Sequence, residues 1–334
     1  MKVKVLGICA AQGAMLFPFK RHLLANIEPR GVFHTLKEEQ WKLNFGEIPF
    51  LKSLEQYKGD KPDIIIGSPS CGHSSVFSYS RKKTLGKPRE DKTLTLYIEA
   101  INKFEPKIFL LENLPKLIDL IPLREWEQKL SKYHLVIHCH SVFDFGNSQK
   151  SRKRLIMIGI RTDSEFKTTD FTEIFKVSKP FLVKDIPNMI DKKLNFTEND
   201  DKKLAMYHYN DPKKTTLTVK QVRELWNGEF KDEFKWPMKT QKMKTLPGVY
   251  RNRKNTYPLT VRPSSRQFNP EGNPMGLEEY KIIMGFPKKF KIYFNSENKT
   301  YWLNKGRNTI TKGSVYEVGK WFKLSLRKSI SRIK

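Results

Sequence analysis

Short apolar runs alternate with helical patterns over the first 165 residues of the chain. Four runs have the length and apolar composition of buried strands, at residues 3–8, 63–67, 107–111 and 155–160. A helical pattern occupies residues 93–104, where apolar side chains recur on one face (Leu94, Tyr97, Ile98 and Ile101). Strands that alternate with helices predict an α/β fold with a mostly parallel sheet.

The pattern changes after residue 165. Residues 166–250 lose their apolar periodicity and are dominated by Lys, Asp, Asn and Thr, which is typical of a small separate domain or of an elaborated insertion. A short helical pattern at 277–284 ends at Gly285-Phe286-Pro287, and residues 313–334 predict a terminal amphipathic helix. We therefore divide the chain into residues 1–165, 166–274 and 275–334, with the last segment returning to the first domain.

Polar turns follow three of the predicted strands. They lie at residues 9–13, at Ser68-Pro69-Ser70-Cys71 and at Glu112-Asn113. Open parallel sheets bind their ligands at the carboxyl ends of the strands. We therefore look for chemistry at these three turns.

Cys71 and Glu112 are the candidates for covalent and acid–base chemistry. Cys71 sits on a tight turn after a buried strand, so its thiol would be exposed and rigidly aimed, as a nucleophile requires. The alternative is an ordinary half-buried cysteine. Glu112 emerges from an apolar strand, where a carboxyl group can have a raised pKa and donate a proton. The alternative for Glu112 is a helix-capping carboxylate.

A basic segment precedes the last predicted strand. Arg152 and Arg154 stand two residues apart, so in an extended chain they share a face and can clamp a planar acceptor or a phosphate. The alternative is a solvated basic flank. His138-Cys139-His140 lacks the spacing of a zinc site, so we expect structural roles there and no bound metal.

Composition adds a partner and a compartment. The 334 residues carry 63 Lys and Arg against 35 Asp and Glu, a formal net charge of +28 that attracts polyanions such as nucleic acid. The alternative is the surface charge of a lysine-rich proteome. Three cysteines make no disulfide framework, no apolar run approaches the about 20 residues of a membrane helix, and the N-terminus lacks a signal-peptide pattern. We therefore expect a soluble, cytoplasmic protein.

In their order and spacing these segments resemble the DNA cytosine-5 methyltransferase family. Residues 67–75 resemble the Pro-Cys-Gln nucleophile loop, Glu112-Asn113-Leu114-Pro115 resembles the Glu-Asn-Val motif, and residues 149–154 resemble the Gln-x-Arg-x-Arg motif. Residues 279–290 resemble the segment with Gly-Phe-Pro, and residues 306–310 resemble the late Gly-Asn-Ala-Val motif. The resemblance covers roughly residues 3–160 and 246–325.

The resemblance implies a Rossmann-like S-adenosylmethionine methyltransferase domain at 1–165 and a small target-recognition domain at 166–274. It implies that the Cys71 thiolate adds to carbon 6 of cytosine and that Glu112 hydrogen-bonds ring N3 and the amino group. Arg154, together with Arg152, would hold O2 of the base. Carbon 5 would then take the methyl group of S-adenosyl-L-methionine, with the base flipped out of duplex DNA.

The cofactor-binding residues that the resemblance implies are Ile8, Cys9, Gly13, Glu47, Pro69 and Asn308. The first motif departs from the family pattern Phe-x-Gly-x-Gly-Gly, because Ala10 and Gln12 replace two glycines whose small size lets the methionine part approach the backbone. The family also places an acidic residue after the second strand. We assign that stretch to residues 32–35 and find no acid before Glu38.

The DNA contacts that the resemblance implies are Ser75, Arg251 and Arg253. Aromatic residues of the recognition segment contact bases or form a small core, and we favour the core for the tryptophans (Tyr207, His208, Tyr209, Trp226, Trp236 and Tyr250). We expect double-stranded DNA as the partner, no membrane, no obligatory protein partner and a monomer in a bacterial or phage-infected cell.

Two alternative functions stay open. One branch of the family acts on tRNA, but we do not see its Cys-Phe-Thr signature near Leu114-Pro115. The other alternative is a DNA-binding relic without catalysis. Because Cys71 and Glu112 are both present, we favour an active DNA cytosine-5 methyltransferase of the DNA-modification type.

Overall fold

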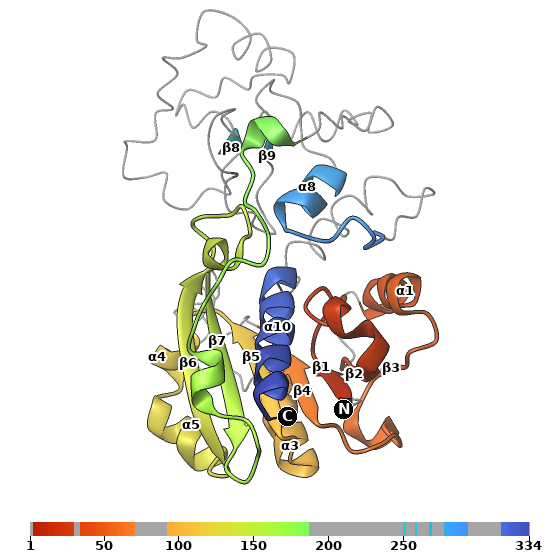
Figure 1. The fold of residues 1–334 in the computed structure, drawn as a ribbon. Helices are drawn as coiled ribbons and strands as arrows, with labels where there is room; N and C mark the ends of the chain where they lie inside the picture. Colours follow the sequence, from red (N-terminus) through yellow and green to blue (C-terminus); the bar gives the residue numbers. More distant parts are fainter. Residues whose placement is uncertain are drawn as a thin grey trace, which may run out of the picture.

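A seven-stranded sheet forms the centre of the computed structural model, which describes residues 3–29, 34–70, 92–186, 250–251, 258, 267–268, 277–292 and 315–333 (Figure 1). The strand order is β3-β2-β1-β4-β5-β7-β6. The strands are β1 (Val5–Ile8), β2 (Leu23–Ile27), β3 (Phe50–Leu51), β4 (Ile64–Gly67), β5 (Ile108–Asn113), β6 (Tyr133–Ser141) and β7 (Lys153–Arg161). The first five in sequence are parallel, and β7 is antiparallel to both of its neighbours. The predicted α/β fold with a mostly parallel sheet is confirmed.

The central strands are apolar throughout because both faces of the sheet are covered. Successive side chains of β5 alternate between two hydrophobic clusters: Ile108 and Leu110 belong to one, and Phe109 and Leu111 belong to the other. Both clusters are buried, so each strand of the centre contributes to two cores. This arrangement fixes the strand ends in space and hence the turns that follow them.

Different helices supply the two clusters. The first cluster receives side chains from η1 (Phe17–His22), α1 (His34–Phe45), η3 (Val142–Phe145), η4 (Thr168–Phe171), α8 (Leu277–Ile283) and α10 (Tyr316–Ile333). The second receives them from η2 (Leu54–Gln56), α3 (Lys92–Phe104), α4 (Leu117–Leu120) and α5 (Leu123–Lys129). The terminal helix α10 crosses one face of the sheet (Figure 1) with Val318, Trp321 and Phe322 buried, as its apolar spacing predicts.

The sequence pattern does not predict β2, β3, β6 or α1. Strand β6 lies at the edge of the sheet, and most of its side chains are only half-buried, so its apolar signal is diluted. Strand β2 is interrupted by Asn26, a polar residue that is 0% exposed. The predicted strand at 155–160 exists as β7 but runs antiparallel, which an apolar run alone does not reveal.

Residues 166–186 pack on the same core as α10. The Trp321 indole donates to the backbone oxygen of Glu173 at 3.0 Å, and the Lys320 ammonium donates to that of Val177 at 2.6 Å. After η5 (Val183–Asp185), most of the predicted recognition segment lies outside the described residues. Its described strands β8 (Tyr250–Arg251) and β9 (Gln267–Phe268) pair in parallel, and the division at residues 165 and 274 stays a prediction.

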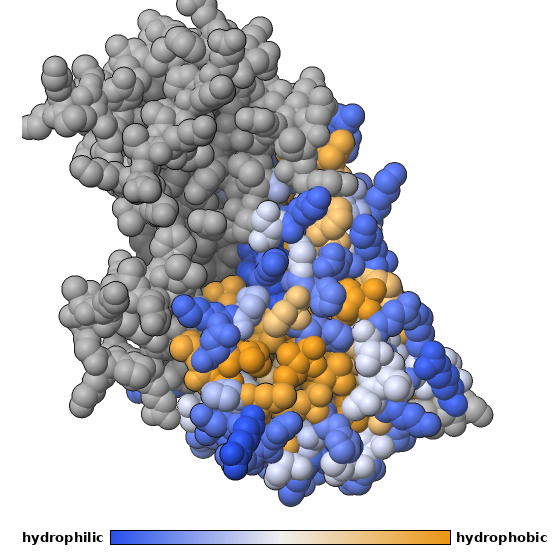
Figure 2. Space-filling model, turned by 90° about the vertical axis from the view of Figure 1, so that its left-hand side faces the viewer, coloured by the Kyte–Doolittle hydropathy of each residue, from blue (hydrophilic) through white to orange (hydrophobic). Residues whose placement is uncertain are grey.

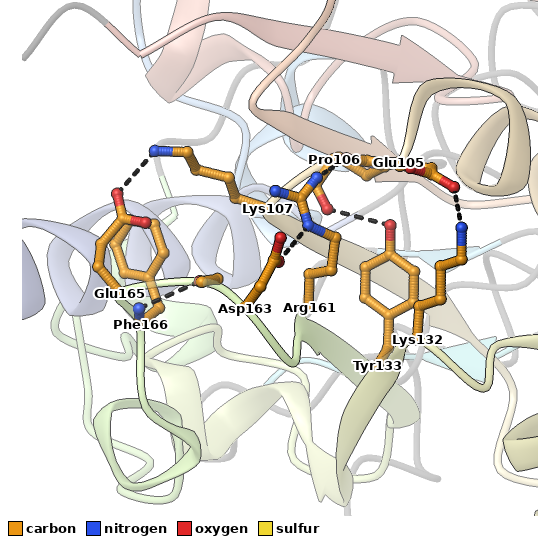
Figure 3. A network of polar contacts seen from close by, with 10 residues as sticks. Glu105, Pro106, Lys107, Lys132, Tyr133, Arg161, Asp163, Glu165 and Phe166 are labelled. Atoms are coloured by element: carbon orange, nitrogen blue, oxygen red, sulfur yellow. Dashed lines mark hydrogen bonds and ion pairs between the residues drawn. The ribbon is translucent and has the colours of Figure 1, made fainter.

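A polar network ties the strands together at the amino end of β5, away from Glu112 (Figure 3). The Arg161 guanidinium donates to Asp163 at 2.5 Å and to the backbone oxygen of Glu105. The Tyr133 hydroxyl donates to the backbone oxygen of Pro106 at 3.0 Å. Because this network joins the ends of β5, β6 and β7, we assign it a structural role.

The edge of the sheet that carries β6, α4 and α5 exposes apolar side chains (Figure 2). Leu120 and Leu123 are 40% and 43% exposed there. In the part of the chain that the structure describes, none of the helices has the length and apolarity needed to cross a bilayer.

Candidate active site

The polar residues that the sequence places at three strand ends meet at one edge of the sheet, but Glu112 and Asn113 are the last two residues of β5 and do not form a turn as predicted. In the strand register Ile8 lies beside Gly67, and Gly67 lies beside Leu111. The turns that follow β1 and β4 and the polar end of β5 are therefore neighbours, since parallel strands end at the same edge. Close approach is enforced at Gly67, where a Cβ atom would lie 2.3 Å from the Ile8 backbone oxygen.

Glu112 is the buried carboxylate at the centre of this edge. It is 3% exposed and is held at both oxygens. Its Oε2 accepts a hydrogen bond from the Ser68 hydroxyl at 2.5 Å, and its Oε1 lies 2.7 Å from Nε of Arg154. The carboxylate plane is thus fixed from the turn after β4 and from strand β7, with a cation beside it.

The turn after β4 is fastened to the helix and the strand beside it. The Asn113 side chain donates to the backbone oxygen of Pro69 at 3.1 Å. The Ser70 amide donates to the Thr93 hydroxyl at 2.7 Å, and the Thr93 backbone oxygen accepts from the Cys9 thiol at 3.7 Å. Thr93, in the first turn of α3, therefore connects the turns after β1 and β4.

The turn after β1 takes left-handed conformations although two of the family's glycines are replaced. Positive φ values occur at Cys9 (53°), Ala11 (51°) and Gly13 (82°), whereas Ala10 and Gln12 do not have them. The two replaced glycines therefore stand where an ordinary side chain is allowed. The left-handed conformations at Cys9 and Ala11 each cost about 1 kcal/mol, which the packed surroundings must offset.

Glu28 is the acid that follows the second strand, and our sequence assignment of that position was wrong. We placed the end of the second strand at residues 32–35, whereas β2 ends at Ile27 and Glu28 follows it directly. Glu28 is 5% exposed, its Oε2 accepts from the Ala11 amide at 3.0 Å, and its Oε1 pairs with Lys37. The signal that identifies it is the apolar run Leu23-Leu24-Ala25, which we did not assign to a strand.

The two candidate arginines occupy different places. Arg154 lies in β7 and contacts Glu112, whereas Arg152 precedes the strand and is 4% exposed. Glu47 is exposed after the left-handed Gly46 (φ 66°) at the end of α1. His138 is half-buried, its Nε2 lies 2.8 Å from the Phe171 backbone oxygen, and burial lowers the pKa of its imidazole.

Several predicted site residues fall outside the described residues. These are Cys71, Ser75, Arg253 and Asn308, together with most of the aromatic residues of the recognition segment (Tyr207, His208, Tyr209, Trp226 and Trp236). Arg251 lies in β8 next to Tyr250. Of the residues that the structure describes, no three His, Cys, Asp or Glu side chains are grouped as a metal site requires.

Comparison with known proteins matches this arrangement to one family. A family model for C-5 cytosine-specific DNA methylases matches residues 19–303. The Type II methyltransferase M.FnuDI of Fusobacterium nucleatum is 24% identical over 320 residues, which cover 90% of this chain and 88% of the relative.

Two solved structures are similar in fold to this chain. A protein assigned as a DNA modification methyltransferase and encoded within an E. coli prophage superposes with a TM-score of 0.67 at 18% identity, covering 98% of this chain and 99% of that one. The methyltransferase EhMeth of Entamoeba histolytica superposes with a TM-score of 0.63 at 15% identity, covering 99% of both chains.

Proposed function

The chain belongs to the C-5 cytosine-specific DNA methylase family and is a DNA cytosine-5 methyltransferase, and we propose that it works through a covalent adduct between Cys71 and a cytosine flipped out of the duplex. The observation that carries the proposal is the carboxylate of Glu112, which Ser68 and Arg154 hold at the edge of the sheet. In the sequence, Cys71 comes three residues after Ser68. A buried carboxyl group can hydrogen-bond ring N3 and the amino group of cytosine, and a guanidinium beside it can donate to the O2 carbonyl.

The reaction needs a nucleophile because carbon 5 of cytosine does not attack a methyl group unaided. The Cys71 thiolate forms a bond to carbon 6, and the electrons of the 5,6 double bond move toward carbon 5. Glu112 hydrogen-bonds ring N3 and the amino group and supplies the proton that stabilises the adduct. Arg154 holds O2 and moves off one oxygen of Glu112 as the base arrives.

The second half of the reaction restores the ring. Carbon 5, made nucleophilic by the adduct with Cys71, would accept the methyl group that bound S-adenosyl-L-methionine would supply. A base removes the proton from carbon 5, the double bond re-forms, and the bond between carbon 6 and Cys71 breaks. The products are 5-methylcytosine and the free thiol.

The described residues fit S-adenosyl-L-methionine. When bound, it supplies the methyl group. Glu28 offers a buried carboxylate beside the turn after β1, and carboxylate oxygens accept hydrogen bonds from the paired hydroxyls of a ribose. Gly13 and Pro69 lie at the same edge of the sheet, and Gly13 has a positive φ, which favours glycine. Ile8, Cys9, Glu47 and Asn308 remain proposed contacts.

Duplex DNA is the proposed partner. The net charge of +28 favours binding to phosphates, and flipping delivers the base to the pocket. Ser75, Arg251 and Arg253 would contact the DNA, with residues 166–274 selecting the target. Because the curated relative is a Type II methyltransferase, we assign the chain to DNA modification of the restriction–modification type, acting as a monomer in the cytoplasm.

Bisulfite sequencing of DNA from cells that express the protein tests this proposal. We expect methylated cytosines in one sequence context with the wild type and none with Cys71→Ala. The control is Cys139→Ala, because Cys139 is an exposed thiol on β6. Retained methylation in Cys71→Ala would remove Cys71 from the mechanism.

A trapping experiment separates the alternatives. With S-adenosyl-L-methionine present, duplex DNA that contains 5-fluorocytosine has no carbon-5 proton to lose after methyl transfer, so the adduct with Cys71 should persist on a denaturing gel. A relic forms no adduct, and an enzyme of the tRNA-acting type transfers labelled methyl groups to tRNA and not to duplex DNA. Either result would contradict the proposal.

A further inference from the structure

A buried carboxyl group lies in the first turn of α10, outside the candidate active site. Glu317 is 3% exposed, and its Oε1 accepts a hydrogen bond from the Asn147 side chain at 3.1 Å. Its Oε2 is buried and has no hydrogen-bond partner in the structure as described. Burying a carboxyl group costs free energy, so its presence calls for a role that an apolar side chain does not fill.

Asn147 connects Glu317 to the loop that leads into β7. Its Oδ1 accepts from the Gln149 amide at 2.9 Å and from the Gln149 side chain at 3.3 Å. The same side-chain nitrogen donates to the backbone oxygen of Ile283 at 3.2 Å. Asn147 and Gln149 are at most 1% exposed, so the loop 147–152 is held from inside by α8 and α10.

Gly285 leaves the space for this contact. It has a φ of 76°, and a Cβ atom there would lie 1.9 Å from Oε1 of Glu317 and 2.4 Å from Nδ2 of Asn147. Any side chain at position 285 would displace one of the two groups. The turn after α8, the loop 147–152 and α10 therefore meet at a single carboxyl group.

The charges around Glu317 come from two elements. Burial raises the pKa of Glu317 to about 8, while the hydrogen bond from Asn147 and the positive charges of Arg152 and Lys320 act in the opposite direction. Tyr316, the residue before Glu317 on α10, is half-buried. Arg152 ends the loop 147–152, so the electrostatic contact acts on the same segment as the hydrogen bonds.

We propose that Glu317 is a positioning residue, which fixes the loop 147–152 through Asn147 and so delivers Arg154 of β7 to Glu112. The loop runs straight into β7, and Arg154 is the second residue of that strand. A displacement of about 1 Å at a reacting group can cost about 10²-fold in rate. This inference rests on the roles of Glu112 and Arg154 in the proposed function.

Two substitutions test the role of Glu317. Glu317→Gln keeps the acceptor for Asn147 without the charge, whereas Glu317→Ala removes it. We expect Glu317→Ala to lower kcat by roughly 10–10²-fold with KM for DNA changed less than about threefold, and Glu317→Gln to restore kcat to within about threefold of wild type. The matched control is Ser325→Ala, a buried hydroxyl further along α10 that should leave kcat unchanged.

Amide hydrogen exchange provides a measurement that does not depend on methyl transfer. In Glu317→Ala we expect faster exchange at Gln149 and Arg152 and unchanged exchange in β4 and α3. Unchanged exchange in the loop, a loosened loop with normal kcat, or a uniform rise over all strands would each overturn the proposal. Failure of the proposed function looks different: Glu112→Gln and Arg154→Ala would then turn over normally, whatever the loop does.

Discussion

The hydroxyl of Thr93 accepts the Ser70 amide hydrogen at 2.7 Å, one residue before the cysteine that we propose as the nucleophile. The backbone oxygen of Thr93 also accepts from the Cys9 thiol at 3.7 Å. One residue at the start of α3 therefore sets the spacing between the turn after β1 and the turn after β4. The position of Ser70 depends on this contact.

We expect Thr93→Val to lower kcat by roughly fivefold, because one hydrogen bond worth about 1 kcal/mol no longer fixes Ser70. Steady-state methyl transfer to duplex DNA measures this effect. Thr93→Ser keeps the hydroxyl and should remain near wild type. If the serine variant lost as much activity as the valine variant, the methyl group of Thr93 and not its hydroxyl would matter.

Glu112→Gln should lower kcat by roughly 10²–10⁴-fold, the usual scale for general acid–base catalysis, because the amide cannot supply the proton to ring N3. Single-turnover methyl transfer checks this expectation. Glu105→Gln is the control, since Glu105 precedes the opposite end of β5 and pairs with the exposed Lys132. A near-normal rate in Glu112→Gln would assign Glu112 a structural role.

Glu28→Ala should weaken binding of S-adenosyl-L-methionine by roughly 10–10²-fold, the scale for lost hydrogen bonds to a charged group. Equilibrium dialysis with the labelled cofactor and no DNA measures it. The control is Glu38→Ala, the first acid after the stretch that we assigned from the sequence, which pairs with Lys42 on α1. Weakened binding in Glu38→Ala with normal binding in Glu28→Ala would restore the original assignment.

The free energy of unfolding should depend on pH through the titration of Glu317. Burial raises its pKa from 4.5 to about 8. The folded protein is therefore most stable below pH 4.5, where Glu317 is neutral in both states, and it loses stability as the pH rises toward 8. Within this window the unfolded chain has released the proton and the folded chain retains it. Relative to Glu317→Gln, which does not titrate, the wild type should lose roughly 1 kcal/mol of stability per pH unit.

Urea unfolding of both proteins at pH 5, 6.5 and 8 measures this difference. Arg152 and Lys320 are present in both proteins, so their charges do not create the difference by themselves. A constant gap between the two curves would show that Glu317 does not titrate in this range.

Local sequence signals were sufficient for the centre of the fold. Strand β5 is an apolar run that ends in Glu112-Asn113, and both the run and its polar end are visible without any long-range information. Strand β2 was missed because buried Asn26 breaks its apolar run, and the acid at its end was missed with it. An error in one strand boundary thus left Glu28 out of the cofactor-binding residues that we expected from the sequence.

Contacts between distant segments could not be predicted from one sequence. Asn147 and Glu317 are 170 residues apart, and neither stands in a pattern that points to the other. The left-handed residues Cys9 and Ala11 are equally hidden, because their side chains do not favour that conformation and only the surrounding packing imposes it. Both features arise from the tertiary structure.

The reversed direction of β7 decides which side chain meets Glu112. Because β7 runs against β5, its first residues arrive where β5 ends, and Asn113 lies opposite Leu155. A strand in the same place running the other way would bring its far end to that edge and leave Arg154 roughly 20 Å away at about 3.3 Å per residue. The guanidinium beside Glu112 is therefore a product of chain topology, because only the reversed direction of β7 brings the start of that strand to the end of β5.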